Sequence, residues 1–541
     1  MAQIPSTHRA IHGTERTPVP GARRVGPADP KEVLTVSVRL RRRQDAPAIP
    51  GLNDYAGNSP GQNRVSRAEF AAKFGAAEAD LERVADFARS YGLGVVESSI
   101  ARRTVVLSGT VEQMNLAFAV ELGQYESPRE SYRGREGPVH LPKELAEVVE
   151  GVFGLDNRQM AERVSGGKRP FSLSPRQVAE LYQFPLEANA QGQTIGLLEF
   201  GGGYKGSDID QYFNSLSLTP PAIFPLGVDG ASNSPGNGKS QAELEVALDI
   251  EVAGAVAQGA AIVVYFAPFT EQGWVDIVTT AVIGEGLPAG WTAPSVISIS
   301  WAWGELEKSG NFAWTEAAIN AVSQTFQEAA MLGATVLAAS GDNGSDCHVG
   351  NKKAHVYYPA SDPWITSCGG TSIRNIIGSS FDEVTWNDDG VTGGGISDIF
   401  TTPYWQLDAN VPVSVNDGHR GRGIPDIAGY ADGYKIFIHG SWVGGVWGTS
   451  ETAPFYAGLM ALINATLGDS IGYLNPTIYQ LGSTDVFRDI SDGGSNSDAG
   501  APGYVSIAGW DACTGWGSVN GAALLNAVET LLFAMILPTL V

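Results

Sequence analysis

The sequence predicts a two-domain protein: an α/β domain built on a parallel β-sheet with helices on both faces, preceded by a smaller α+β domain. Apolar, strand-like runs alternate with helical stretches over the later part of the chain, as in parallel sheets. The earlier part shows the order strand, helix, strand, strand, helix, strand, and a polar, turn-rich segment separates the two parts. The length of 541 residues also exceeds that of most single domains.

The first domain is predicted over residues 31–157, after residues 1–30, whose richness in Pro, Arg and Gly predicts disorder. Its expected elements are a strand at Leu34–Leu40, a helix at Glu78–Tyr91, strands at Gly94–Glu97 and Thr104–Leu107, a helix at Val111–Phe118 and a strand near Ala119–Tyr125. Thr110 is a suitable N-cap for the second helix. This order of elements is the ferredoxin-like pattern.

The second domain is predicted over residues 171–541, behind an exposed linker at residues 158–170. Its apolar runs are Thr194–Phe200, Ala261–Ala267, Ser295–Trp301, Thr335–Ser340 and a weaker Trp364–Cys368. Continuous apolar runs separated by helices are typical of parallel strands that are buried on both faces. Functional groups in such sheets lie at the carboxyl ends of the strands, where Glu199, Trp301 and Asp342 fall.

The distribution of charge restricts the possible partners. Residues 1–169 carry 24 Lys+Arg and 21 Asp+Glu, a net charge of +3; residues 170–541 carry 11 and 37, a net charge of −26, and the sum is −23. A mildly basic first domain can dock on so acidic a second domain. Nucleic acid is not an expected partner of an acidic body. The acidic surface suits activity at low pH, although ordinary solubility charge explains it equally well.

The chain ends and the cysteines indicate neither a membrane protein nor a disulfide scaffold. The first residues lack the apolar stretch of a signal peptide, and the apolar tail Leu531–Leu537 is too short to cross a bilayer. A terminal helix packed on the body is expected there. The cysteines Cys347, Cys368 and Cys513 form no CxxC motif, and one bridge among them is possible.

Ser450 is the candidate nucleophile. It follows Gly448 and Thr449 at the start of a predicted helix, where backbone N–H groups and the helix dipole favour an oxyanion. Pro454 fits the first helical turn, because its missing N–H costs little there. A helix N-cap is the alternative for a bare Gly-Thr-Ser, but the longer pattern Gly-Thr-Ser-x-x-x-Pro-x-x-Ala-Gly is more specific.

A serine nucleophile needs a proton acceptor, and the sequence favours a carboxylate over a histidine. None of the seven histidines precedes the helix that a histidine base would need. Glu245 and Asp249 are four residues apart in an otherwise apolar helical segment, so they share one helix face. Buried carboxylates this close share a proton and separate their pKa values. A solvated surface face is the alternative for each acidic residue taken singly.

Two further acidic features are candidates for function. Asp342 follows the run Thr335–Ser340, and a carboxyl kept protonated there can donate a hydrogen bond to an oxyanion, as in ketosteroid isomerase. A plain turn residue before Asn-Gly is the alternative. The loops Asp489–Asp492 and Ile507–Asp511 offer carboxylates and free carbonyls, which suit a hard cation such as calcium, although such loops often have no ligand.

Together, these stretches resemble the sedolisins, or serine-carboxyl peptidases, and most of all their kumamolisin branch. The resemblance extends from about Phe171 to Leu525, and the first domain is more loosely similar to the propeptide of the family. The stretches that carry it are Leu198–Tyr204, Glu245–Glu251, Val296–Trp301, Ser340–Ser345, Gly393–Ile396, Gly448–Pro454 and Gly509–Asp511.

The resemblance implies a subtilisin-like fold and an acid-active serine endopeptidase. It implies that Ser450 is the nucleophile, Glu245 the general base, Asp249 the residue that orients the base, and Asp342 the protonated acid of the oxyanion hole. It adds an outer hydrogen-bond network of Glu199 and Trp301, and one calcium ion. The implied calcium ligands are the carboxylates of Asp489 and Asp511 and the carbonyls of Ile490, Ile507 and Gly509.

The resemblance also implies a zymogen. The first domain is expected to assist folding and to inhibit the second until cleavage in or near Arg163–Phe171 releases a secreted, monomeric enzyme that acts on proteins or peptides. Two rival hypotheses are kept. A conventional subtilisin-like enzyme with a histidine base predicts a neutral pH optimum. A silent, calcium-stabilised binding protein predicts a folded chain without turnover at any pH.

Overall fold

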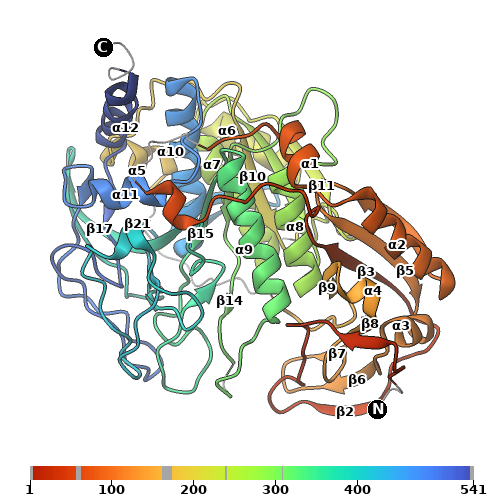
Figure 1. The fold of residues 1–541 in the computed structure, drawn as a ribbon. Helices are drawn as coiled ribbons and strands as arrows, with labels where there is room; N and C mark the ends of the chain where they lie inside the picture. Colours follow the sequence, from red (N-terminus) through yellow and green to blue (C-terminus); the bar gives the residue numbers. More distant parts are fainter. Residues whose placement is uncertain (1–3, 57–62, 161–172, 238–239, 308, 537–541) are drawn as a thin grey trace.

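The second domain is built on an eight-stranded sheet in a computed structural model that describes residues 4–56, 63–160, 173–237, 240–307 and 309–536 (Figure 1). The strand order is β11 (Ile223–Gly227), β12 (Ala261–Phe266), β10 (Thr194–Glu199), β13 (Val296–Ile299), β15 (Thr335–Ala339), β17 (Thr366–Ile377) and β18 (Ser380–Thr385), with β21 (Ile427–Tyr430) also paired to β17. All pairs are parallel except β17 with β18. The predicted parallel α/β sheet is therefore confirmed.

Helices cover both faces of this sheet. On one face, α8 (Glu271–Ile283) and α9 (Glu316–Met331) contribute to one buried cluster. On the other, α7 (Gln241–Val256) and α10 (Thr452–Leu467) contribute to a second cluster. Every residue of α7 from Glu245 to Val256 is buried, because the helix lies between the sheet and other helices. This burial on all sides explains why apolar residues occur around the whole helix, and it places the carboxylates of Glu245, Asp249 and Glu251 inside the protein.

The first domain contains a four-stranded antiparallel sheet in the order β4 (Gly94–Ser99), β5 (Thr104–Thr110), β3 (Val33–Leu40), β9 (Val149–Phe153). Helices α2 (Glu78–Ser90) and α3 (Val111–Phe118) complete the ferredoxin-like arrangement. The bounds of α3 are as predicted, because Thr110 and Gln113 form a capping box.

The fourth strand of this domain corrects the prediction near Ala119–Tyr125. Ala119 ends α3 in the left-handed conformation, with φ of 47°, and the strand β6 begins only at Gly123. β6 (Gly123–Glu126) pairs with β2 (Arg23–Pro27) and β7 (Ser131–Gly134) in a separate sheet. β9 takes the fourth position, since its Val152 and Phe153 pair with Val38 and Ser37 of β3.

The expected disorder of residues 1–30 is wrong for the described residues 4–30. β1 (His8–Ala10) pairs with β8 (His140–Pro142), and β2 pairs with β6. Ile11 is buried, and the guanidinium of Arg16 donates to the Ala313 carbonyl at 3.0 Å and pairs with Glu271 at 2.9 Å. Composition alone could not reveal this segment's contacts with distant partners.

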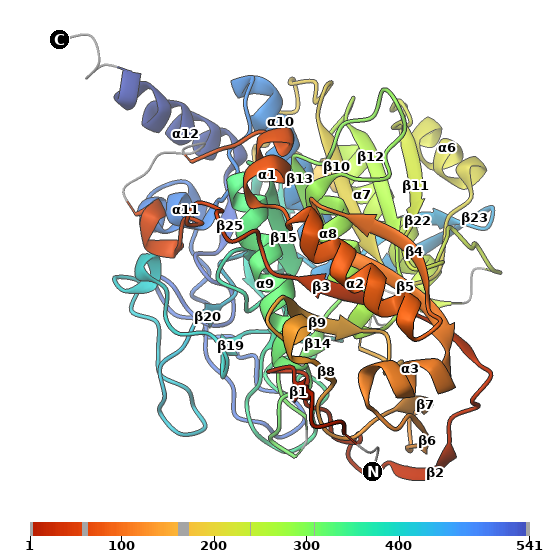
Figure 2. The same cartoon turned by 45° about the vertical axis from the view of Figure 1, so that its right-hand side comes forward.

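The first domain docks with its sheet against α8 and α9 (Figure 2). The Ser37 hydroxyl donates to Asp276, and the Arg39 guanidinium donates to Thr279 at 3.3 Å and Thr325 at 3.2 Å. The expected processing segment Arg163–Phe171 lies outside the described residues.

Two further expectations concern the whole chain. α12 (Gly521–Ile536) is the terminal helix, and within the described ranges no helix has both the length and the apolar character needed to cross a membrane. Cys347, Cys368 and Cys513 are all buried and unbridged.

Candidate active site

Glu245 and Asp249 lie one turn apart on α7, and both side chains are fully buried. The helix begins with a capping box, in which the Ser240 hydroxyl accepts from the Glu243 N–H at 3.4 Å and the Glu243 carboxylate accepts from the Ser240 N–H at 3.3 Å. The predicted pair of carboxylates on one helix face is therefore present inside the protein, where an ionised carboxylate needs partners.

Ser300 connects Asp249 to the candidate nucleophile. Its hydroxyl lies 2.8 Å and 3.0 Å from the two carboxylate oxygens of Asp249, and 3.3 Å from the backbone carbonyl oxygen of Ser450. Ser300 directly follows β13 and was not predicted as a site residue, because a serine at a strand end is a common feature. The contact fixes the acidic face of α7 relative to the turn that carries Ser450.

Glu199 and Trp301 form the expected outer pair. Glu199 ends β10, Trp301 follows the neighbouring strand β13, and the Trp301 indole N–H donates to the Glu199 carboxylate at 2.9 Å. Both side chains are buried. The hydrogen bond from Trp301 holds the buried Glu199 carboxylate in one orientation. Glu199 can therefore position another acidic side chain of the site.

Ser450 lies in a short 3-10 turn, Thr449–Glu451, that leads into α10. Gly448 has a φ of 142°, and a Cβ atom at this position would lie 2.2 Å from the Asp342 Oδ2 atom and 3.3 Å from the Ser450 Oγ atom. Only glycine fits there. The carboxyl oxygen of Asp342 and the hydroxyl oxygen of Ser450 therefore face the same small space.

Asp342 follows β15 and is fixed by Thr449. Its Oδ1 atom accepts from both the backbone N–H and the hydroxyl of Thr449, each at 2.6 Å. The Thr449 hydroxyl in turn accepts from the Gly341 N–H at 3.0 Å. These bonds hold Oδ1 and direct Oδ2 towards Gly448 and Ser450, which is the orientation that an oxyanion donor needs.

Glu451, next to the nucleophile, is a buried acid that the sequence reasoning missed. Its carboxylate accepts from the Gly433 N–H at 3.2 Å and from the Tyr434 N–H. Burial, helped by the charges of Asp432 and Asp342, raises the pKa of Glu451 well above its ordinary value. Its hydrogen bonds tie the nucleophile turn to β22 (Tyr434–Ile438).

Several histidines have partners away from this cluster. His439 pairs with Glu243 at 3.0 Å, His355 contacts Asn351 at 2.8 Å, and His419 pairs with Asp417 at 2.7 Å. These contacts give no support to a histidine base.

The two predicted calcium loops lie beside each other. The Gly509 N–H donates to the Asp489 carboxylate at 3.0 Å, and the Ile507 N–H donates to the Asp511 carboxylate at 3.1 Å. Asp511 is buried and also accepts from the Cys513 and Thr514 N–H groups. Carboxylate and backbone oxygens are the donor set that calcium prefers, so the chemistry of these residues fits the ion.

Comparisons with known proteins agree with this fold and site. The family model described as the pro-kumamolisin activation domain matches residues 20–158. Kumamolisin from Bacillus sp. (strain MN-32) is 41% identical over 508 residues, which cover 90% of each chain. Tripeptidyl-peptidase sed5 from Aspergillus fumigatus is 30% identical over 544 residues, covering 90% of this chain and 91% of that protein.

A solved structure adds to this. Pseudomonas sedolisin, a serine-carboxyl proteinase, superimposes with a TM-score of 0.57 at 25% identity, covering 68% of this chain and 99% of that chain. Fold and relatives together define a serine-carboxyl peptidase with a subtilisin-like α/β domain and an N-terminal activation domain. The chain belongs to the sedolisin family, in which kumamolisin is a relative that matches along most of its length.

Proposed function

We propose that this peptidase is an acid-active endopeptidase that uses Ser450 as nucleophile, Glu245 as general base and Asp249 as the residue that orients the base. The observation that carries the proposal is the joint position of the groups. Ser300 bridges Asp249 and the Ser450 backbone, and the Asp342 carboxyl and the Ser450 hydroxyl face one space beside Gly448.

In the acylation step, ionised Glu245 takes the proton of the Ser450 hydroxyl while the Oγ atom attacks the carbonyl carbon of the scissile peptide bond. The carbonyl oxygen becomes an oxyanion. A protonated Asp342 and backbone N–H groups of the Ser450 turn donate hydrogen bonds to it. The carbon–nitrogen bond then breaks, and Glu245 gives its proton to the leaving amine.

Deacylation reverses the roles of the same groups. Glu245 takes a proton from water, the resulting hydroxide attacks the ester carbon, and the Ser450 oxygen leaves with that proton. Asp249, held by Ser300, and Glu199, held by Trp301, keep the acidic cluster in place. Because Asp342 must be protonated and Glu245 ionised at once, activity is expected at acidic pH.

We further propose that the first domain inhibits the second through a buried ionic interface. Glu328 of α9 pairs with Arg42 at 2.6 Å and with Arg103 at 3.4 Å, and all the groups except Arg42 are almost fully buried. Burial raises the pKa of Glu328, but the charges of Arg103, Arg42 and Arg39 outweigh burial and leave it below its ordinary value. Ionised Glu328 therefore stabilises docking above its ordinary pKa, and this contribution is lost as the pH falls through the lowered value.

Glu328→Gln in the full-length precursor is expected to weaken docking by about 3 kcal/mol, because buried arginines lose their counter-charge. The variant should be processed at a higher pH than the wild type. The measurement is the fraction of cleaved precursor on a gel after incubation at a series of pH values.

Glu187→Gln is the matched control, since Glu187 is an exposed carboxylate of the second domain. It should process like the wild type. Identical pH dependence of processing in the Glu328 variant and the wild type would show that this ion pair does not hold the precursor together.

We propose that Asp489, Asp511 and the carbonyls of Ile490, Ile507 and Gly509 hold one calcium ion that stabilises the fold. Two observations support this proposal: the residues offer the carboxylate and carbonyl oxygens that calcium prefers, and the two loops contact each other. Chelation is expected to lower the melting temperature of the wild type by about 3–6 °C at calcium levels that saturate the site. Differential scanning calorimetry with and without added calcium measures the shift.

Asp489→Asn should abolish most of this calcium-dependent shift, because it removes one carboxylate ligand. Asp485→Asn, an exposed residue four positions earlier, should keep the full shift. A wild-type melting temperature that is the same with and without calcium would contradict the proposed calcium site.

We also propose that the mature enzyme is secreted and monomeric. Activity confined to acid fits an enzyme that works outside the cell. Fractionation of expressing cells and size-exclusion chromatography test these two points, and an intracellular or oligomeric enzyme would refute the corresponding one.

A further inference from the structure

Met160 lies in the segment 158–170 that was predicted as an exposed linker, but it is buried and bound by the second domain. Its N–H donates to the Phe269 carbonyl at 2.9 Å, and its own carbonyl accepts from the Trp274 indole N–H at 2.6 Å. Its side chain is 2% exposed. Both backbone groups of this residue are thus bonded to the peptidase domain, in the way that binding sites hold a residue of an extended peptide.

The side chain of Met160 belongs to a large buried apolar cluster. Phe269 and Trp274, which bond its backbone, pack in this cluster with three further aromatic rings, and we call the five residues the Met160 socket: Phe200, Phe269, Trp274, Trp301 and Trp314. The rings support each other, with centroid distances of 4.2 Å between Phe200 and Trp274 and 5.7 Å between Trp274 and Trp314. All five rings belong to the second domain. The socket is therefore part of the peptidase that remains once the first domain has been removed.

The socket borders the acidic cluster of the active site. Phe269 packs edge-on against Trp301, with ring centroids 5.2 Å apart, and Trp301 donates to Glu199. A residue bound in the socket is therefore separated from the acid network by only one or two side chains.

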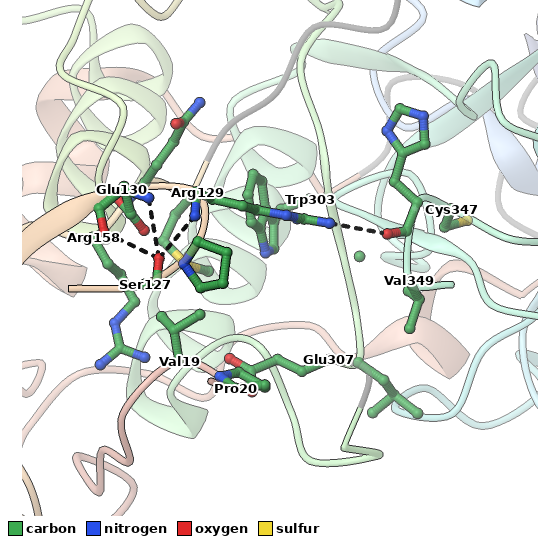
Figure 3. A pocket seen from close by; sticks show the side chains of 16 residues that line it. Val19, Pro20, Ser127, Arg129, Glu130, Arg158, Trp303, Glu307, Cys347 and Val349 are labelled. Atoms are coloured by element: carbon green, nitrogen blue, oxygen red, sulfur yellow. Dashed lines mark hydrogen bonds between the residues drawn. The ribbon is translucent and has the colours of Figure 1, made fainter. Parts of the chain in front are cut away.

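A cavity of about 340 Å³ continues from Met160 along the boundary between the two domains (Figure 3). Ser127, Arg129 and Glu130 line it from the first domain, and Trp303 and Cys347 line it from the second. Arg129 donates across it to the His348 carbonyl at 3.4 Å. The second domain's side of the cavity includes Trp303, which is two residues after Trp301 of the socket. A peptide bound in the socket could therefore extend into this cavity.

We propose that the Met160 socket is a substrate subsite of the mature peptidase, which binds a large apolar side chain of an extended peptide at a distance from the scissile bond. The inference rests on the proposed function, since it needs the peptidase to act on peptides. In the precursor, Met160 fills the subsite and blocks it.

The chemistry of the socket sets the selectivity. The bonds to Phe269 and Trp274 use only backbone atoms of the occupant, so they hold any residue in an extended conformation. The aromatic walls favour a side chain such as methionine, leucine or phenylalanine. A serine or aspartate side chain would lose its hydration on entering this apolar cluster. Binding at such a remote position increases kcat/KM when it helps to place the scissile bond.

The test uses the full chain, activated at acidic pH, and a set of quenched fluorogenic octapeptides. A single methionine, or a single serine, is moved through each position on both sides of the scissile bond. At one position, methionine is expected to give a kcat/KM about tenfold above serine. Trp274→Phe keeps an aromatic ring but removes the indole N–H that bonds the backbone of any occupant, and should lower kcat/KM for the methionine and the serine peptide alike by about threefold to tenfold.

Trp442→Phe is the matched control, because Trp442 lies on β23 (Ser441–Val446) and packs on Phe437 instead. It should leave kcat/KM of both peptides unchanged. Hydrolysis of the peptides without preference at any position, or a kcat/KM that Trp274→Phe leaves unchanged, overturns the inference but leaves the proposed function intact. An activated chain that hydrolyses no peptide at any pH refutes the proposed function instead, and the inference with it.

Discussion

Ser450→Ala is expected to reduce kcat for peptide hydrolysis by at least about 10⁴-fold, because the nucleophile of a triad acts as a unit with its base. Glu245→Gln should cause a loss of similar order, since the amide cannot take the proton. The Ser450 variant should also remain an uncleaved precursor at acidic pH. Steady-state kinetics and gel analysis of the precursor measure both effects.

The fold is expected to survive the loss of the Ser450 hydroxyl, which makes no hydrogen bond within the described part of the chain. The melting temperature is therefore the internal control. Ser441→Ala, an exposed serine on β23, controls for the substitution itself. Turnover by the Ser450 variant close to that of the wild type would remove this residue from the mechanism.

Asp342 is expected to show different effects for two substitutions. Asp342→Ala removes a donor to the oxyanion and should reduce kcat by about 10²–10³-fold. Asp342→Asn keeps the Oδ1 atom that accepts from Thr449 and places an N–H at the Oδ2 position facing Ser450. It should retain more activity than the alanine variant.

The pH dependence distinguishes the two forms of residue 342. A carboxyl donates only while it is protonated, so the wild type loses this hydrogen bond as the pH rises through the pKa of Asp342. An amide donates at every pH. The alkaline limb of the kcat profile should therefore move to higher pH in Asp342→Asn. An unchanged alkaline limb would show that Asp342 is not the titrating donor.

Local signals predicted the elements that depend on local sequence. The start of α3 could be predicted to the residue, because its capping box, Thr110 with Gln113, lies within four consecutive residues. The buried strands β10, β12 and β15 were found from their apolar runs. The fourth strand of the first domain could not be found in this way, since Val149–Phe153 is chosen by its pairing with β3.

The same limit applies to the site. The spacing of Glu245 and Asp249 predicts a shared helix face, and α7 provides it. Ser300 and Glu451 carry no local signal, because their importance comes from contacts with Asp249 and with the backbone at Tyr434. The socket for Met160 carries no local signal either, since its rings come from α8 and from loops that are far apart in the sequence.

The most direct test of the central claim is the profile of kcat/KM from about pH 2 to pH 9 for the wild type and Glu245→Gln. A carboxylate base predicts a wild-type optimum in acid and a Glu245→Gln variant with almost no activity across the whole range. A neutral optimum, or a Glu245→Gln variant that keeps most of its activity, would contradict the serine-carboxyl mechanism.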